Sequence, residues 1–282
     1  MCLAKYQPLV CELCVVATLA LLSVILQIAV GDFPLSMFRF PLNLILFVGW
    51  LATLVVSYNR YAQSRVVQSL LSRRATWLSL GLLVVVGVWL GLQREPASRA
   101  WPIVVSLLYV LSHLTLVTLR GWRNERGVRW LFLLNHLGLW LALVAGFWGA
   151  PDCEQVRVMV ADGLPTNEAF DSEGRTSRLD YTLQLIDLEE ERYADGSPVS
   201  FMAQVEVDGR RVALRANHPY RRSLSEMLYL VSYDAEPNDR ARYCVVEVVR
   251  EPWQWLSMVG IVMLIAGAVL MFVRGPRREV ER

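Results

Sequence analysis

Two histidines lie within long, mostly apolar stretches of this 282-residue sequence, His113 between Leu107 and Leu116 and His136 between Leu131 and Trp140. An ionisable ring is costly in hydrocarbon, so each imidazole is expected to face other helices, a cavity or a cofactor. Histidine is a common axial ligand of haem iron. Both residues are therefore candidates to bind a haem b, with His136 as the axial ligand of its iron.

Each histidine could instead bond a neighbouring hydroxyl or carbonyl group, for instance through Ser112 or Asn135, and fasten two helices together. We favour this role for His113. Both residues lie six positions from the ends of their stretches that flank the same basic loop, or roughly 9 Å along a helix. A haem ligated by both imidazoles is the competing interpretation. The third histidine, His218, precedes a proline at a strand end and is expected to be an exposed turn residue.

The elements that would position these rings are apolar spans. Apolar residues make up 55% of the chain and the mean hydropathy is +0.37, which is too much hydrophobic surface for one soluble core. Each stretch approaches the roughly 20 residues that a bilayer crossing requires. We predict six transmembrane helices, at residues 9–30, 42–57, 75–92, 102–119, 130–149 and 253–273.

Basic residues are divided unevenly between the short connecting segments. Thirteen Lys and Arg residues occur in the N-terminal segment, the loops after the second and fourth spans, and the tail, against three in the other short loops. Because basic loops remain in the cytoplasm, both termini are predicted to be cytoplasmic. In residues 59–74, apolar residues fall on one helical face and arginines on the other, which predicts a short surface helix, with a solvated basic loop as the alternative. Because membrane topology accounts for these basic residues, we expect no nucleic-acid partner.

Between residues 150 and 252 the pattern changes to strand-like alternation. Phe201 to Val207 alternates, Asp208-Gly209 supplies a turn, and an apolar face resumes at Val212, which is a hairpin signature. Further strands are predicted at 156–160, 181–193, 227–233 and 242–249, with 163–177 as loop. The predicted fold is therefore a membrane α-helical region (1–149), an extracytoplasmic antiparallel β domain, either a sandwich or an open barrel (150–252), and a last helix with a basic tail (253–282).

Other residues with reactive side chains give weaker signals. Cys153 and Cys244 flank the β domain and could form a disulfide in an oxidising compartment, although sequence does not show that their α-carbons lie within bonding distance. The sequence has no nucleophile elbow, phosphate loop or paired metal-ligand spacing. We therefore expect no self-contained catalytic site.

Several landmarks in order resemble the ResB/CcsB family of cytochrome c biogenesis proteins, the system II branch. They are the segment from Asn135 to Gly149, the Tyr193-Ala-Asp-Gly-Ser-Pro198 turn, Arg215 to Pro219, Leu228 to Asp234, and Arg250-Glu-Pro-Trp253 before the last span. The likeness runs from about Trp130 to Arg278. The chain departs from the family in having five spans before the domain, where three are typical, and in a shorter external domain.

The resemblance implies a multi-pass subunit of the bacterial cytoplasmic (inner) membrane that works with a CcsA/ResC-like partner to carry haem and present it to apocytochrome c. In the family, the histidine matching His136 is implicated as a haem ligand, which is why we favour that role here. Arg120, Arg123 and Arg129 would then lie near the propionates. An arginine-rich patch of the β domain could also contact the propionates, but a solvated sheet face is the simpler interpretation. The patch consists of Arg210, Arg211, Arg215, Arg221 and Arg222. A stand-alone b-type electron-transfer protein and a non-catalytic membrane scaffold are the alternative functions.

Overall fold

The chain forms two compact units. In the computed structural model, the described residues are 7–92, 99–122, 129–192, 198–233 and 243–274, without the side chains of 7–15, 122, 190–192, 198–200 and 274. The helical unit comprises Met1–Pro151 and Leu256–Arg282, and the β unit comprises Asp152–Trp255.

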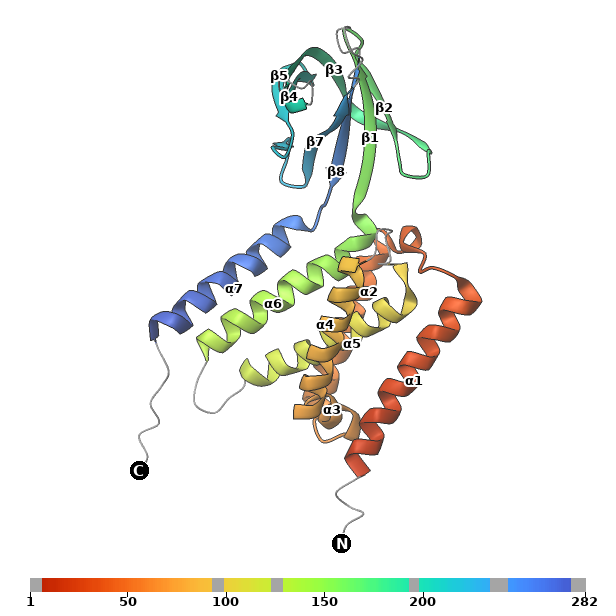
Figure 1. Cartoon of the computed structure of the whole chain (residues 1–282). Coiled ribbons are helices and arrows are strands. Elements are labelled where there is room, and N and C mark those ends of the chain that lie inside the picture. Colours follow the sequence, from red (N-terminus) through yellow and green to blue (C-terminus); the bar gives the residue numbers. More distant parts are fainter. Residues whose placement is uncertain (1–6, 93–98, 123–128, 193–197, 234–242, 275–282) are drawn as a thin grey trace. The chain divides into compact units, whose positions relative to one another are not determined.

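Among the described residues, the helical unit contains six long helices and one short one (Figure 1). They are α1 (Gln7–Val30), α2 (Leu42–Arg60), α3 (Arg65–Leu70), α4 (Arg73–Leu92), α5 (Trp101–Trp122), α6 (Trp130–Gly149) and α7 (Gln254–Arg274), with 3₁₀ turns at Leu35–Phe38 and Ala150–Asp152. Five described helical segments are long and apolar enough to cross a membrane, at residues 42–60, 73–92, 101–121, 130–152 and 254–273. In α1, the apolar part among residues with described side chains is Val16–Val30.

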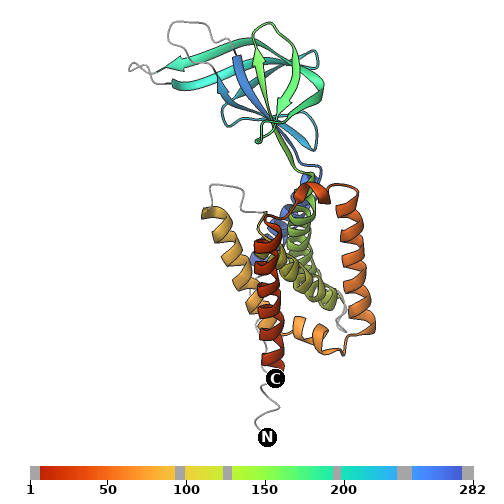
Figure 2. The ribbon, with the colours of Figure 1, turned by 90° about the vertical axis from the view of Figure 1, so that its right-hand side faces the viewer.

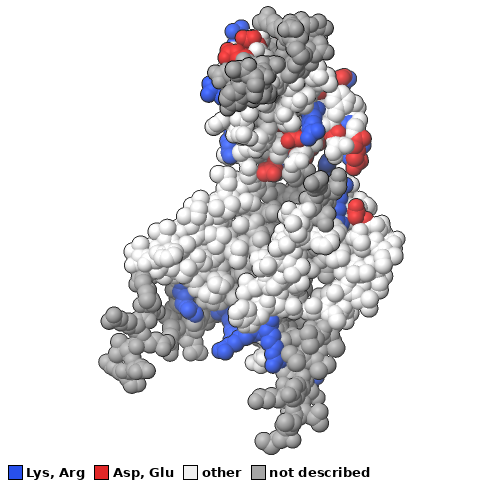
Figure 3. All heavy atoms as spheres, in the orientation of Figure 1, with Lys and Arg blue, Asp and Glu red and all other residues white. Residues whose placement is uncertain are grey.

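Helix α5 is the centre of this unit, because α1, α2, α4 and α6 all contact it. Figure 2 shows the helical unit after a quarter turn, with α2 and α4 on either side and α1 in front of the inner helices. Outward-facing Leu, Ile, Val and Phe side chains of α1, α2, α4 and α7 are exposed, and the flanks of the helical unit are almost entirely uncharged in Figure 3. An apolar exterior of this extent identifies a membrane protein, since lipid replaces the water that would penalise it.

Polar side chains join the inner helices. The Trp50 Nε1 donates to the Ser112 hydroxyl at 3.1 Å, which ties α2 to α5, and the Trp140 Nε1 donates to the Thr115 hydroxyl at 2.8 Å, which ties α6 to α5. The buried Asn43 amide donates to the carbonyl oxygen of Trp148 at 3.0 Å and joins α2 to α6. Without competing water, such bonds fix which helix faces are in contact.

The β unit is one antiparallel eight-stranded sheet in the order β5-β4-β3-β2-β1-β8-β7-β6. Its strands are β1 (Glu154–Ala161), β2 (Thr166–Phe170), β3 (Thr176–Arg192), β4 (Pro198–Val207), β5 (Arg210–Arg215), β6 (Tyr220–Arg221), β7 (Glu226–Tyr233) and β8 (Tyr243–Arg250). The sheet curls so that β5 contacts β6 and β7, which encloses the inward-facing residues in a single core. The antiparallel β architecture predicted from alternation is confirmed, in its open-barrel form.

Two local predictions for this unit have different outcomes. The Asp208-Gly209 hairpin is confirmed, since both residues have positive φ (52° and 77°) and Val207 pairs with Arg210. The predicted loop at 163–177 is wrong, because it contains β2 and the first residues of β3. Strand β2 buries Ala169 alone, and one small inward residue leaves almost no apolar alternation to detect. The predicted turn at Asp195-Gly196 lies outside the described residues.

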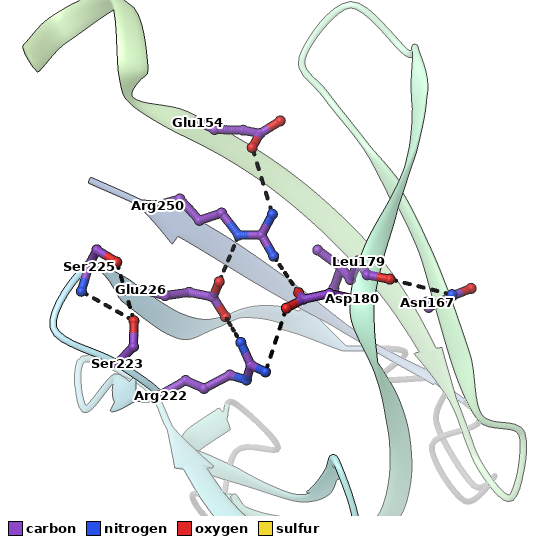
Figure 4. A network of polar contacts seen from close by, with 9 residues as sticks. All are labelled: Glu154, Asn167, Leu179, Asp180, Arg222, Ser223, Ser225, Glu226 and Arg250. Atoms are coloured by element: carbon purple, nitrogen blue, oxygen red, sulfur yellow. Dashed lines mark hydrogen bonds and ion pairs between the residues drawn. The ribbon is translucent and has the colours of Figure 1, made fainter. Parts of the chain in front are cut away.

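An ionic network closes one end of the barrel (Figure 4). The Glu226 carboxylate, only 5% exposed, accepts hydrogen bonds from the Arg250 Nε at 2.6 Å and from the Arg222 Nη1 at 3.3 Å. Asp180 of β3 contacts the same two guanidinium groups, at 2.8 Å to Arg250 and 3.9 Å to Arg222. The Arg222 guanidinium also lies over the Tyr181 ring, 3.8 Å from its centroid. The network therefore holds β3, β7 and β8 together.

Replacing Glu226 with Gln should loosen this end of the β unit. The variant removes one charge of a buried pair, and the two arginines, each about a quarter to a third exposed, recover part of their solvation, so we expect a local loss of roughly 2–3 kcal/mol. Hydrogen exchange of the β7 and β8 amides in the full chain measures it. As a matched control, Glu247→Gln breaks the exposed Arg157–Glu247 pair and should cost less than about 1 kcal/mol. Equal protection in both variants would contradict the prediction.

Candidate functional site

His136 lies on α6, one turn after Phe132, with its ring partly buried. Its Nδ1 is 3.0 Å from the Phe132 carbonyl oxygen. A carbonyl oxygen only accepts, so the neutral ring carries its proton on Nδ1 and its lone pair on Nε2. A backbone hydrogen bond through one nitrogen is the arrangement by which proteins orient a histidine to ligate metal through the other.

An aromatic stack fixes the plane of the His136 ring. The Phe132 ring is stacked on it with centroids 3.7 Å apart and an angle of 22° between planes. On the α5 side, a Cβ at Gly121 would lie only 1.7 Å from the Phe132 ring. Gly121 therefore provides the space that Phe132 occupies. The guanidinium of Arg129 lies 5.6 Å from the centroid of the Phe132 ring, so a cation, a phenyl ring and an imidazole follow one another over about two turns of helix.

His113 has a different environment. It is 5% exposed, and its Nδ1 donates to the Leu70 carbonyl oxygen of α3 at 2.6 Å. Helix α6 contacts the other side of α5, because the Trp140 indole bonds to Thr115, and residues 113 and 115 point about 200° apart on a helix. The structure does not bring His113 and His136 together. The bond from His113 to Leu70 matches the fastening role predicted for this residue. The haem ligated by both rings stays a prediction.

Neither of the neighbours expected to bond these histidines does so. The Ser112 hydroxyl donates to the Leu108 carbonyl oxygen while accepting from Trp50, and the Asn135 amide donates to the Leu131 carbonyl oxygen. Asn135 packs against α7 instead, since a Cβ at Gly267 would lie 2.6 Å from its side-chain oxygen. One turn further along α6, the backbones of Gly138 and Gly260 approach so closely that neither position has room for a side chain. Small residues thus set the α6–α7 contact.

A cavity of about 280 Å³ lies between α2, α5 and α6. The threonine hydroxyls of its wall donate to carbonyl oxygens of their own helix, at 2.7 Å each. His136 does not line the cavity, so the cavity supplies no ionisable ligand. Its lining residues are Leu51, Val55, Thr115, Thr118, Leu119, Leu133, Leu137 and Trp140. No local sequence pattern predicts this cavity or the Gly121 contact, although a glycine near the end of a predicted span is a signal for close approach.

The other candidate residues are dispersed. His218 is an exposed turn residue, as predicted, with its backbone N–H donating to the Arg215 carbonyl oxygen. Arg222 is committed to the Glu226 network, whereas the rest of the arginine-rich patch is exposed on the sheet. Arg120 donates to the Leu71 carbonyl oxygen at 3.4 Å, and Arg123 lies outside the described residues.

The proposed disulfide between Cys153 and Cys244 is absent, as both thiols are free. Cys244 pairs with Val160, whereas Cys153 lies seven residues earlier, just before β1. At ~3.3 Å per strand residue that offset is roughly 23 Å, far beyond the ~7 Å limit between bridged α-carbons. The two cysteines flank the domain in sequence, but the antiparallel β1–β8 pairing places them at opposite ends of the ladder.

The chain is similar to known proteins in two of three comparisons. The model of the ResB-like family matches residues 123–243, which confirms over this segment the resemblance predicted from sequence. No curated protein matches the chain. Among solved structures, a cytochrome c haem lyase, CcmF, is similar with a TM-score of 0.37 and 12% identity, over 81% of this chain and 44% of that protein. The chain therefore spans less than half the length of that protein.

Replacing Gly121 with Ala should change the position of the His136 ring without direct contact between the two residues. The added methyl group would displace the Phe132 ring, so the imidazole would lose its stacked partner. Because the chain has three histidines, ¹⁵N-histidine NMR of the haem-free protein can follow His136 directly. We expect its ring signals to shift or broaden in Gly121→Ala. Gly146→Ala on α6, where a Cβ meets nothing within 4 Å, is the matched control. Unchanged His136 signals in Gly121→Ala would show that the stack does not position the ring.

The two β-unit thiols should react slowly in the folded protein. Burial and the neighbouring Glu251 carboxylate raise the pKa of Cys153 to about 11, and burial raises the pKa of Cys244 to about 12. At pH 8 the thiolate population of Cys153 is then roughly 10² lower than for an ordinary cysteine. Its iodoacetamide alkylation rate should rise about tenfold per pH unit from 8 to 10.

Glu251→Gln should speed the alkylation of Cys153, because removing the carboxylate lowers the pKa of the thiol. Cys244 should react only on unfolding, since it is fully buried. Mass spectrometry of alkylated peptides measures both rates. Thiols that stay unreactive in the unfolded chain until a reductant is added would contradict the free-thiol assignment.

Proposed function

We propose that this chain, which matches the ResB-like family over residues 123–243, is a membrane subunit of cytochrome c biogenesis that holds haem as cargo through His136. The observation that carries the proposal is the hydrogen bond from the His136 Nδ1 to the Phe132 carbonyl oxygen. It leaves Nε2 as a free electron-pair donor on a ring whose orientation is fixed. The family match supports a role in cytochrome c biogenesis, and the oriented ring of His136 supports haem binding.

The residues present fit a haem for reasons beyond the ligand. His136 is only partly buried, so its ring is accessible from outside the packed interior, unlike the buried His113. Arg129 is exposed and lies over Phe132, next to the histidine, and a guanidinium pairs well with carboxylates such as the haem propionates. His136 would hold the iron and Arg129 would attract the acidic edge. The bound haem would supply the group that is attached to apocytochrome c.

The proposal includes a partner. One imidazole is available, since His113 lies on the opposite side of α5, and a second axial ligand would come from a CcsA/ResC-like membrane protein. In this arrangement six helices span the bacterial inner membrane, both termini are cytoplasmic, and the β unit is extracytoplasmic, where apocytochrome c and the partner would meet it. The separation of the two histidines argues against a stand-alone b-type cytochrome ligated by both.

Replacing His136 with Ala should abolish haem retention. The full chain is co-expressed with its CcsA/ResC-like partner, purified, and analysed by reduced-minus-oxidised and pyridine haemochrome spectra. We expect haem per folded protein to fall more than about tenfold, since even the supporting partners of metal ligands change affinity about 10- to 100-fold. Added imidazole should restore part of the spectrum.

His113→Ala is the matched control, because it removes a helix-borne imidazole on the side of α5 that faces α3, away from α6. It should lower thermal stability while haem per folded protein stays unchanged. Equal haem loss in both variants would favour the two-histidine cytochrome. Normal haem content and normal cytochrome c maturation in His136→Ala cells would favour the scaffold and overturn the proposal.

A further inference from the structure

Four exposed arginines surround the connection between α2 and α4: Arg60, Arg65, Arg73 and Arg74. We call this set the basic corner. No Asp or Glu occurs between Asp32 and Glu95 in the sequence. Among the residues that the structure describes, no ion pair reaches any of the four. In Figure 3, several blue residues lie together at the lower end of the helical unit, with no red visible among the described residues there. The charge of the basic corner therefore lacks a counter-ion from its own segment of the protein.

The backbone of the basic corner is held in place. Two consecutive carbonyl oxygens at the end of α3 accept hydrogen bonds from α5, Leu70 from the His113 Nδ1 and Leu71 from the Arg120 Nη1. Val67 is 5% exposed and anchors α3 in the helical unit. The Ser64 hydroxyl accepts from the Val67 N–H and the Ser72 hydroxyl accepts from the Ala75 N–H, which caps α3 and α4. A ligand would bind here without ordering the loop first, which lowers the entropic cost of binding.

Side chains suited to the membrane interface flank the arginines. Tyr61 is 60% exposed, Val66 62% and Trp77 76%. Tyrosine and tryptophan concentrate at the level of lipid head groups, and a basic segment with exposed apolar residues binds anionic membrane surfaces. The basic corner is attached to the His113 side of α5, opposite the side that packs on α6. It is therefore separate from His136 and its candidate cargo.

We propose that the basic corner binds the phosphate head groups of anionic phospholipids, with Tyr61, Val66 and Trp77 inserted among the adjoining acyl chains. Guanidinium groups form paired hydrogen bonds with phosphate oxygens. Lipid would thereby supply the anions that this segment of the protein lacks, and would anchor the α3 connection on which His113 and Arg120 also converge.

The test measures lipid affinity of the purified full chain in detergent, by native mass spectrometry and thermal shift, with phosphatidylglycerol against phosphatidylcholine. We expect preference for phosphatidylglycerol, weakened in 1 M NaCl. Each basic residue near an anionic surface contributes ~1 kcal/mol, so replacing Arg65, Arg73 and Arg74 together with Gln should weaken binding about 100-fold. The corresponding triple Lys variant keeps the charge and should retain most of the affinity.

Removing three arginines could also alter membrane insertion, so a second variant leaves them all in place. Gln68→Glu puts a carboxylate one turn from Arg65 on α3, where Gln68 is exposed, and acidic residues have little effect on topology. It should weaken phosphatidylglycerol binding about fivefold. Gln155→Glu, at an exposed position of β1, should leave it unchanged.

Three outcomes would overturn the proposal. One is equal affinity for the two lipids. Another is an affinity within about twofold of the wild type in both the triple Gln variant and Gln68→Glu. The third is full displacement of the lipid by inorganic phosphate at matched concentration, which would identify a soluble anion as the ligand.

Discussion

Polar groups inside an apolar slab must find partners within the protein, and this constraint determines how the helices are arranged around α5. The indoles of Trp50 and Trp140 reach hydroxyl groups on α5, and the His113 ring reaches the backbone of α3. Each bond selects one face of α5 for one neighbour. Helix α6 is consequently fixed on the Thr115 side and α3 on the His113 side, and the separation of the two histidines follows from these contacts.

The same constraint separates two roles that a buried histidine can have. His113 and His136 both donate through Nδ1 to a carbonyl oxygen, but the acceptor of His113 belongs to another helix and that of His136 to its own. The first bond joins two elements and the second orients a ring. The sequence predicts similar depths for the two histidines on adjacent helices. Depth alone carries no information about the direction in which each ring points.

Local residue patterns predicted some features of the fold. The features that depend on how neighbouring strands or helices are aligned with one another were not predicted. Long apolar stretches and the Asp208-Gly209 hairpin follow directly from composition and turn chemistry, and five long apolar helices and the antiparallel β domain are confirmed. Strand β2 was missed because Ala169 is its only buried residue. The Cys153–Cys244 bridge failed because sequence does not show the β1–β8 register. The Phe132 ring against Gly121 depends on how two helices are rotated, which no local pattern reports.

The pairing of β1 with β8 along their whole length, from Glu154–Arg250 to Ala161–Tyr243, has one more consequence. The first and last strands of the β unit run side by side, and the Trp253 indole closes their base by donating to Asp152 at 2.8 Å. The polypeptide thus leaves this module next to where it came in. Because its entry and exit points are adjacent, a domain of this kind can be inserted between two neighbouring helices, or removed, without changing the path of either helix. The packing of α6 on α7 through Gly138 and Gly260 lies within the helical unit and involves no residue of the β unit.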